Sequence, residues 1–179
     1  MTENKELETC IARIATGDQA AFAALYDACS RSMFAYAVSV LHAPERADDV
    51  VQDAFLKIWR AAPSYDAHGK PMAWILRITR NLCLDELRRS VPEPLEEVAD
   101  RADPSDSGAQ VVDREYVRAL LDGELTDEER DIVRLRIYAD LPHNEIAEAM
   151  GLSTAAVRWK YTYALKKLRR RCLADERAV

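Results

Sequence analysis

The sequence contains few residues that interrupt helices. Only 5 glycines and 7 prolines occur among 179 residues, and no two glycines are adjacent. Alanine and leucine, both strong helix formers, are abundant. Apolar residues make up 49% of the chain, which is enough for a packed core and excludes wholesale disorder. We therefore predict an all-α fold.

Several other classes of protein are excluded by simple features. The longest mostly apolar run, residues 33–41, is too short for a membrane-spanning helix, which needs about 20 residues. The N-terminus is polar and acidic, unlike a secretory signal, so we expect no membrane insertion. The cysteines are far apart and form no CxxC pair, which favours reduced thiols in a cytoplasmic protein. They are Cys10, Cys29, Cys83 and Cys172.

No motif for catalysis or cofactor binding is present. His42, His68 and His143 are isolated, and the sequence contains neither an HExxH motif nor a glycine-rich phosphate loop. We expect no catalytic residue, no metal and no cofactor.

The net charge of −6 is unevenly distributed along the chain. The negative excess lies in residues 91–123, whereas the charged residues of 152–172 are all lysine or arginine. A basic segment of this kind is typical of contact with nucleic acid, which the total charge conceals.

Residues 91–112 have the composition of a linker. They contain three prolines (Pro92, Pro94 and Pro104), the run DPSDSG and no aromatic residue. We therefore predict two small helical domains, 1–91 and 113–179, joined by a flexible acidic linker at 92–112.

Caps and prolines divide both domains into helices. In the first domain, Asp18 caps one helix, Pro44 begins a second that ends near Pro63, and Pro71 begins a third after a loop at 63–70. In the second domain, an apolar stripe at 116–121 stops at Gly123. Thr126 and Glu129 then form a capping box, Pro142 begins a short helix, and Ser153 caps the basic helix.

The last two helices have the layout of a helix-turn-helix. Residues 143–150 form the first helix, Gly151 permits the turn, and the basic helix follows Ser153. The N-terminal residues of such a second helix face base edges in the major groove, which predicts contacts by Thr154, Arg158 and Trp159. Lys160 is better placed for phosphates. The alternative is an ordinary helical hairpin with a solvated charged tail.

The helix after Pro71 carries a stripe of Trp74, Arg77, Asn81, Leu84 and Arg88, with Arg80 beside it. Guanidinium groups that hold a backbone, next to a ring that stacks on a base, suit single-stranded nucleic acid. The alternative is a solvated helix face with a half-buried tryptophan.

The helix that begins at Pro44 has an acidic outer side. Asp48, Asp49, Gln52 and Asp53 lie there, next to Phe55 and its neighbours Leu56 and Trp59. This arrangement favours a basic protein partner. The alternative is that Asp48 and Asp49 simply complement the helix dipole.

Taken together, these stretches resemble the extracytoplasmic-function (ECF) group of the sigma-70 family, the sigma factors of bacterial RNA polymerase. FAALYDACSRSMFAYA is similar to the opening helix of the family, and ADDVVQDAFLKIWR to its polymerase-binding segment. MAWILRITRNLCLDELRR resembles the WL-x-x-I-A-x-N-x-x-x-D-x-x-R signature. LTDEERDIVRLRIYADLPHNEIAEAMGLSTAAV resembles the promoter-reading domain. The four blocks occur in the family's order.

The resemblance implies roles for individual residues. The segment that binds the β′ subunit of core RNA polymerase corresponds to Asp48, Asp49, Gln52, Asp53 and Phe55. The part that captures the minus-ten element corresponds to the loop 63–70 and to Trp74, Arg77, Arg80, Asn81, Asp85 and Arg88. The helix that reads the minus-thirty-five element corresponds to Ser153, Thr154, Arg158, Trp159 and Lys160. Promoter DNA and an anti-sigma factor are the further partners that the resemblance implies.

The recognition helix departs from the family pattern. The family usually has Gly-Thr-Val-Lys-Ser-Arg where this chain has Ala155-Ala156-Val157-Arg158-Trp159-Lys160. Two roles are open to Trp159: contact with a thymine methyl group, or packing inside a regulatory complex. We predict a sigma factor that initiates transcription. The competing hypothesis is a helix-turn-helix regulator that binds DNA without polymerase.

Overall fold

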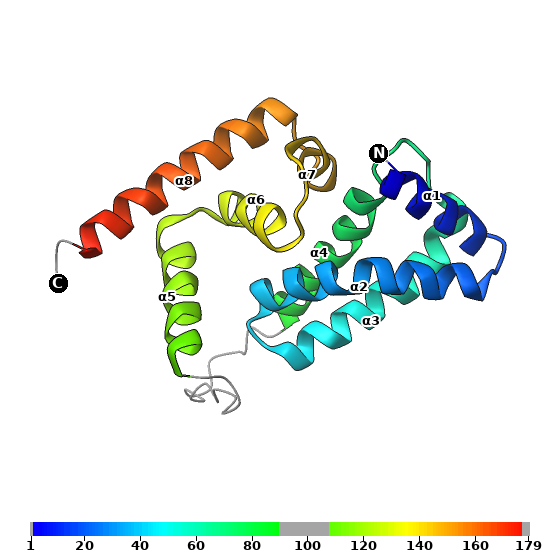
Figure 1. Ribbon diagram of the computed structural model, residues 1–179, viewed down its shortest axis with the longest axis horizontal. Helices are drawn as coiled ribbons and strands as arrows, with labels where there is room; N and C mark the ends of the chain where they lie inside the picture. Colours follow the sequence, from blue (N-terminus) through cyan, green and yellow to red (C-terminus); the bar gives the residue numbers. More distant parts are fainter. Residues whose placement is uncertain (1, 90–107, 177–179) are drawn as a thin grey trace. The chain divides into compact units, whose positions relative to one another are not determined.

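The computed structural model describes residues 2–89 and 108–176, and all regular structure in these ranges is helical (Figure 1). The predicted all-α fold is confirmed. Most of the predicted linker lies outside the described residues. A helix begins at Gly108, within the last part of this segment. The linker stays a prediction.

Nine helical elements occur within the described ranges. They are α1 (Thr2–Ile14), α2 (Gln19–Leu41), α3 (Pro44–Ala61), the 3-10 helix η1 (Ala62–Ser64), α4 (Pro71–Arg89), α5 (Gly108–Glu124), α6 (Asp127–Tyr138), α7 (His143–Met150) and α8 (Thr154–Glu176). Neither α1 nor the short η1 was predicted from the sequence, which indicated a loop at 63–70. α5 continues through Gly123, where the sequence predicted a stop.

The predicted caps begin the helices as expected. The Asp18 carboxylate accepts a hydrogen bond from the backbone N–H of Ala21 at 3.0 Å. That bond and a second one from Arg13 hold the pKa of Asp18 below its ordinary value. Pro44 occupies the first turn of α3, where its missing N–H costs no hydrogen bond.

The chain divides into two compact units. The first combines residues 1–91 with 134–158, and the second combines 92–133 with 159–179. Helices α6 and α8 therefore contribute residues to both units. The division into domains 1–91 and 113–179 stays a prediction.

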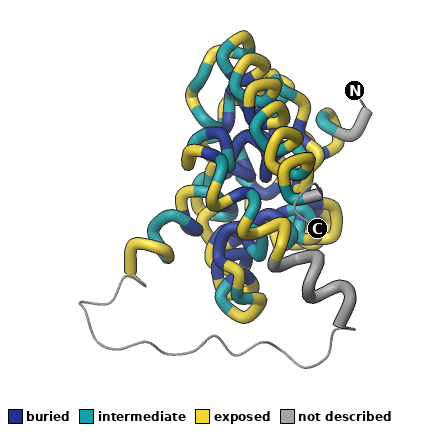
Figure 2. Tube along the Cα trace, turned by 90° about the vertical axis from the view of Figure 1, so that its left-hand side faces the viewer, coloured by how far each residue is buried: buried dark blue, intermediate teal, exposed yellow. Residues whose placement is uncertain are grey.

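The core of the first unit lies among the helices α1 to α4. Helix α2 packs against α1, α3 and α4, and α7 packs against α4. Ile11, Leu25, Met33, Ile58 and Leu76 are completely buried there, and Figure 2 shows how buried residues recur along the chain. One apolar side of each helix is therefore removed from water, which is the main source of its stability.

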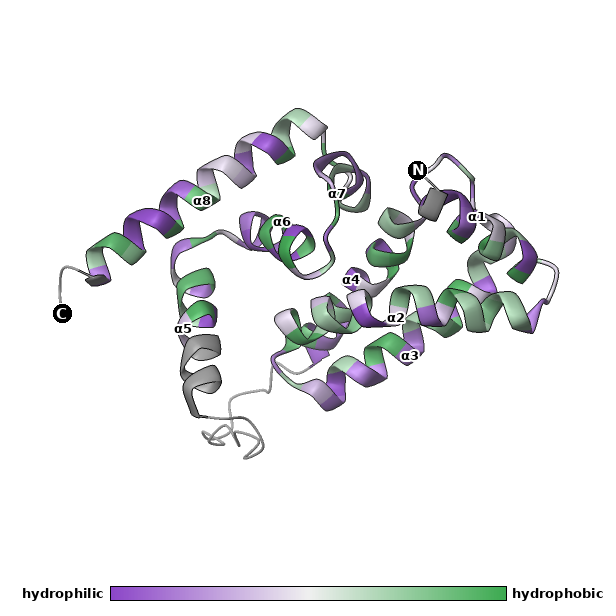
Figure 3. Ribbon diagram, viewed as in Figure 1, coloured by the Kyte–Doolittle hydropathy of each residue, from purple (hydrophilic) through white to green (hydrophobic). Residues whose placement is uncertain are grey.

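The second unit has a smaller core. Leu121, Leu125, Val133 and Ala164 form it, with Tyr161 and Leu168 packed against them. Hydrophilic and hydrophobic residues alternate along α8, which supplies three of these side chains (Figure 3). No helix in the described ranges is long and apolar enough to cross a membrane. All four cysteines are free thiols.

Candidate functional surfaces

The outer side of α3 forms an exposed acidic face. Asp48, Asp49, Gln52 and Asp53 are all exposed, and the Gln52 amide donates a hydrogen bond to Asp48 Oδ2 at 3.3 Å. Leu56 continues this face one turn further and is 53% exposed. We call these five residues the acidic face.

A shallow hollow runs along the acidic face toward α4. Asp49, Gln52, Asp53 and Leu56 line it together with Arg46, Val50 and Glu86. Arg46 Nε lies 3.1 Å from Glu86 Oε1 and joins α3 to α4 at the edge of the hollow. An apolar side chain inside a ring of carboxylates suits a partner that offers a cation beside an apolar residue.

Phe55 does not belong to this surface. It is only 3% exposed and packs edge-on against Phe22, with ring centroids 5.9 Å apart, and at a tilt against Tyr26, with ring centroids 4.7 Å apart. The helical period of 3.6 residues turns Phe55 inward and Leu56 outward. Phe55 supports α3 from within, and Leu56 is the exposed apolar residue of the face. The role in polymerase binding that the resemblance implies for Phe55 stays a prediction.

A stripe of polar and charged side chains runs along α4. Arg77, Asn81 and Arg88 are exposed, whereas Trp74, Arg80 and Asp85 are half-buried. Ile75 and Leu82 are buried on the opposite side of the helix. Cationic and amide groups thus lie along one side of α4, with an aromatic ring near its N-terminus.

The loop that precedes α4 is attached to α1. Tyr65 lies beside Trp74, with ring centroids 4.8 Å apart, and its hydroxyl donates to Glu8 Oε1 at 3.3 Å. Burial and the Glu8 carboxylate raise the pKa of Tyr65. Glu8 also accepts the backbone N–H of Gly69 at 2.6 Å. Glu8 therefore fixes both ends of the loop, a role that the sequence did not reveal.

The same loop meets α7 within the first unit. His68 Nε2 lies 3.4 Å from Glu148 Oε1, and Lys70 Nζ lies 3.5 Å from Glu148 Oε2. The Asn4 amide donates to Glu145 Oε1 at 3.0 Å. Glu145 and Glu148 both belong to α7, so this helix makes polar contacts with the loop and with α1.

The turn between α7 and α8 has the geometry that the sequence predicts. Gly151 adopts a φ of 69° and ends α7 in the left-handed region, where a Cβ is unfavourable. The Ser153 hydroxyl accepts the backbone N–H of Ala156 at 3.1 Å and caps α8. Ile146, Ala147 and Val157 are buried at the crossing of the two helices.

The first turns of α8 expose the predicted DNA-binding residues to different degrees. Arg158 is exposed and Trp159 is 63% exposed, whereas Thr154 is half-buried. Lys160 Nζ lies 2.6 Å from Glu128 Oε2 on α6. Lys160 therefore has a partner within the chain and would have to leave it to bind a phosphate.

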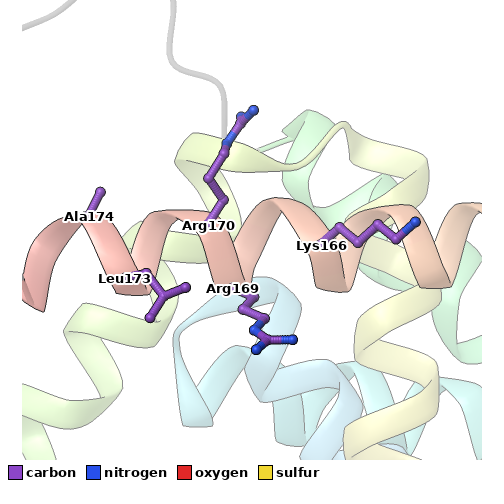
Figure 4. A pocket seen from close by; sticks show the side chains of 5 residues that line it. All are labelled: Lys166, Arg169, Arg170, Leu173 and Ala174. Carbon is purple, nitrogen blue, oxygen red and sulfur yellow. The ribbon is translucent and has the colours of Figure 1, made fainter.

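The last turns of α8 are strongly basic. A hollow there is lined by Lys166, Arg169, Arg170, Leu173 and Ala174, all from this one helix (Figure 4). Within the residues whose side chains are described, no group of three or more His, Cys, Asp or Glu could hold a metal ion. The surfaces described above present charged groups, aromatic rings and amides, which suit the binding of macromolecules.

Two regions of the chain match known families. Residues 25–91 match the family described as Sigma-70 region 2, and residues 123–170 match Sigma-70, region 4. The first match contains the acidic face, the loop and the α4 stripe. The second contains α6, α7 and the first turns of α8.

Relatives are similar over nearly the whole chain. The ECF RNA polymerase sigma factor SigK of Mycobacterium sp. strain KMS is 28% identical, with 92% of this chain and 89% of the relative covered. The protein of the same name from Mycobacterium tuberculosis strain H37Ra (ATCC 25177) is 27% identical, with 93% of both chains covered.

Solved structures are similar as well. In the structure of CnrH in complex with the cytosolic domain of CnrY, the matched chain is 27% identical, with a TM-score of 0.75 and coverage of 95% of this chain and 99% of that one. The sigma factor RpoE of Bartonella quintana, in complex with the anti-sigma factor NepR, shares the fold at 21% identity and a TM-score of 0.58, with 77% and 88% of the chains covered.

Proposed function

The chain belongs to the extracytoplasmic-function group of the sigma-70 family, and from this premise we propose how its surfaces bring core RNA polymerase to promoters. As an alternative sigma factor it starts transcription at a particular set of promoters. We place this role in the cytoplasm and assign no catalytic step to the chain itself.

The acidic face binds core polymerase in this proposal. Its carboxylates and Leu56 are exposed on one side of α3, and the buried Phe55 ring on the inner side of that helix contacts Phe22 and Tyr26 of α2. The family's β′-binding segment corresponds to this stretch. This exposed face carries the proposal, because a regulator that binds only DNA has no use for it.

The α4 stripe and the loop 65–70 capture the minus-ten element. Once the strands separate, a base stacks on the Trp74–Tyr65 ring pair while Arg77 and Arg88 hold the sugar–phosphate backbone. Base stacking offsets part of the unstacking free energy, a few kcal/mol, that opening requires. The contacts of Glu8 with Tyr65 and Gly69 keep the loop in place beside the rings.

The α7–α8 pair reads the minus-thirty-five element as duplex DNA. Ser153 fixes the start of α8, and Arg158 and Trp159 extend from its exposed side toward the major groove. Thr154, in the first turn of α8, joins them at the base edges, and Lys160 takes a position closer to the phosphates.

An anti-sigma factor is the regulatory partner that we propose. The structurally similar chain CnrH was solved in complex with the cytosolic domain of CnrY. A partner that covers the acidic face would prevent polymerase binding without altering the fold.

A binding experiment separates a sigma factor from a regulator that acts without polymerase. The full-length chain is titrated against core RNA polymerase, beside the double variant Asp49→Lys, Asp53→Lys and the matched control Glu6→Lys, which reverses an exposed carboxylate on α1. We expect tight binding for the native chain and the control, and loss of binding for the double variant. Equal affinity of the double variant, or no binding by any chain, contradicts the proposal.

A further inference from the structure

Two aromatic rings stack on the exposed side of α8. Trp159 and Tyr163 have ring planes 5° apart and centroids 5.4 Å apart, and they are 63% and 46% exposed. The residues are one helical turn apart, so both rings lie on the same side of the helix. Because the two rings lie side by side, they form a contiguous apolar patch, the kind of surface that a partner covers.

The ring pair is held in place from the interior of the second unit. Lys167 Nζ lies 4.8 Å from the centre of the Tyr163 ring and 2.7 Å from Glu129 Oε2. The Glu129 side chain is only 6% exposed. A series of contacts therefore runs from Glu129 through Lys167 and Tyr163 to Trp159. Rings that are already ordered lose less entropy when they bind.

The position of the pair along α8 indicates its partner. Trp159 directly follows the exposed Arg158, at the end of α8 that the proposed function places in the major groove. Of the groups that base pairs present in that groove, the C5-methyl of thymine is the apolar one. An indole ring suits a methyl group better than it suits a phosphate or a polar base edge.

We propose that Trp159 and Tyr163 form an aromatic platform that binds a thymine methyl group in the upstream promoter element. Trp159 contacts the methyl, and Tyr163 is a positioning residue that fixes the indole. The proposal rests on the proposed function, because it requires α8 to lie in the groove. It explains why a large aromatic residue stands where the family usually has serine.

Replacing thymine by deoxyuridine tests the platform, because this change removes the methyl and leaves base pairing intact. Duplex sites are selected from a random pool with the full-length chain, and each thymine is then replaced in turn. We expect affinity to fall about fourfold at one or two positions, the loss that corresponds to one buried methyl group.

Variants test whether the platform causes the methyl effect, which is the difference in affinity between thymine and deoxyuridine. Trp159→Ala should bind thymine and deoxyuridine equally, and Tyr163→Ala should lose most of the difference. Tyr163→Phe should keep it, because the ring remains. Leu165→Ala is the matched control: Leu165 is an exposed apolar residue of α8 that lies on another side of the helix, so its loss should leave the effect intact.

Three outcomes would overturn the platform. They are selected sites without a constant thymine, equal affinity for thymine and deoxyuridine at every position, and a methyl effect that survives Trp159→Ala. The titration against core polymerase is an independent measurement. If the chain binds core polymerase but has equal affinity for thymine and deoxyuridine, only the aromatic platform is contradicted. If the affinities differ but the chain does not bind core polymerase, only the proposed function is contradicted.

Discussion

Lys167 and Glu129 form an ion pair that joins α8 to the start of α6, with Lys167 Nζ 2.7 Å from Glu129 Oε2. The same carboxylate oxygen accepts the backbone N–H of Thr126 at 3.0 Å, and the Thr126 hydroxyl accepts the N–H of Glu129 at 3.3 Å. The capping box of α6 is therefore also the attachment point of α8.

This ion pair predicts a pH-dependent contribution of Glu129 to stability. Burial raises the pKa of Glu129, but the hydrogen bonds from Lys167 and Thr126 outweigh burial and hold the pKa below its ordinary value. The stabilisation is therefore complete above about pH 4.3, the ordinary glutamate value, and is lost as the pH falls through the lower folded value. Glu129→Gln should cost about 1–3 kcal/mol of unfolding free energy at pH 7.

Denaturant unfolding of both chains between pH 3 and pH 7 measures this difference. The difference in unfolding free energy between the native chain and the Glu129→Gln variant should decrease toward pH 3. Asp127→Asn is the control, because its side chain is almost fully exposed and its loss should change stability little. If this difference is equally large at pH 3 and pH 7, the charge of Glu129 does not contribute to stability.

Gly151 and Gly123 provide a matched pair for backbone strain. Gly151 has a φ of 69°, whereas Gly123 lies within α5, and a Cβ would meet no atom within 4 Å at either position. Gly151→Ala should therefore destabilise the chain by about 1–2 kcal/mol through backbone strain alone. Gly123→Ala should leave stability unchanged or raise it slightly. Thermal unfolding checks both, and equal effects would exclude strain as the cause.

Arg158 is expected to contribute to sequence readout. Arg158→Ala should weaken binding to a selected duplex by about 1–3 kcal/mol and binding to a scrambled duplex much less. Arg171→Ala, which removes an exposed arginine paired with Asp175 within α8, is the control. Affinity is measured on both duplexes over a range of salt concentrations. An equal loss on the two duplexes would reassign Arg158 to a phosphate contact.

Trp74 is expected to act in strand opening and not in polymerase binding. Trp74→Ala should reduce the stability of the open promoter complex by about 1–3 kcal/mol, because a stacking ring is lost. Permanganate reactivity of unpaired thymines measures opening, and titration against core polymerase should be unchanged. Leu87→Ala removes an exposed apolar side chain elsewhere on α4 and serves as the control. If the Trp74→Ala variant opens the promoter as well as the native chain does, the Trp74 ring does not take part in strand opening.

Local signals in the sequence predicted most of the helices correctly. Asp18, Thr126 with Glu129, and Ser153 cap their helices through hydrogen bonds that span three residues, so the sequence alone displays them. The 3.6-residue period likewise predicted which side of α3 is acidic.

Contacts between distant residues were not predictable in this way. Glu8 bonds to Gly69 across 61 positions, and no short pattern marks that pair. Helix α1 was overlooked although Leu7, Ile11 and Ile14 repeat at helical spacing and are buried. The stacking of Trp159 on Tyr163 also depends on Lys167 and Glu129, which come together only after folding.

Run-off transcription is the most direct test of the central claim. Core RNA polymerase is mixed with the full-length chain and with a set of genomic promoter fragments, and the transcripts are sized. The account predicts discrete transcripts from a subset of promoters, present only when the chain is added and absent with the Asp49→Lys, Asp53→Lys double variant. No new transcript from any fragment, with a core enzyme that is active with another sigma factor, would contradict it.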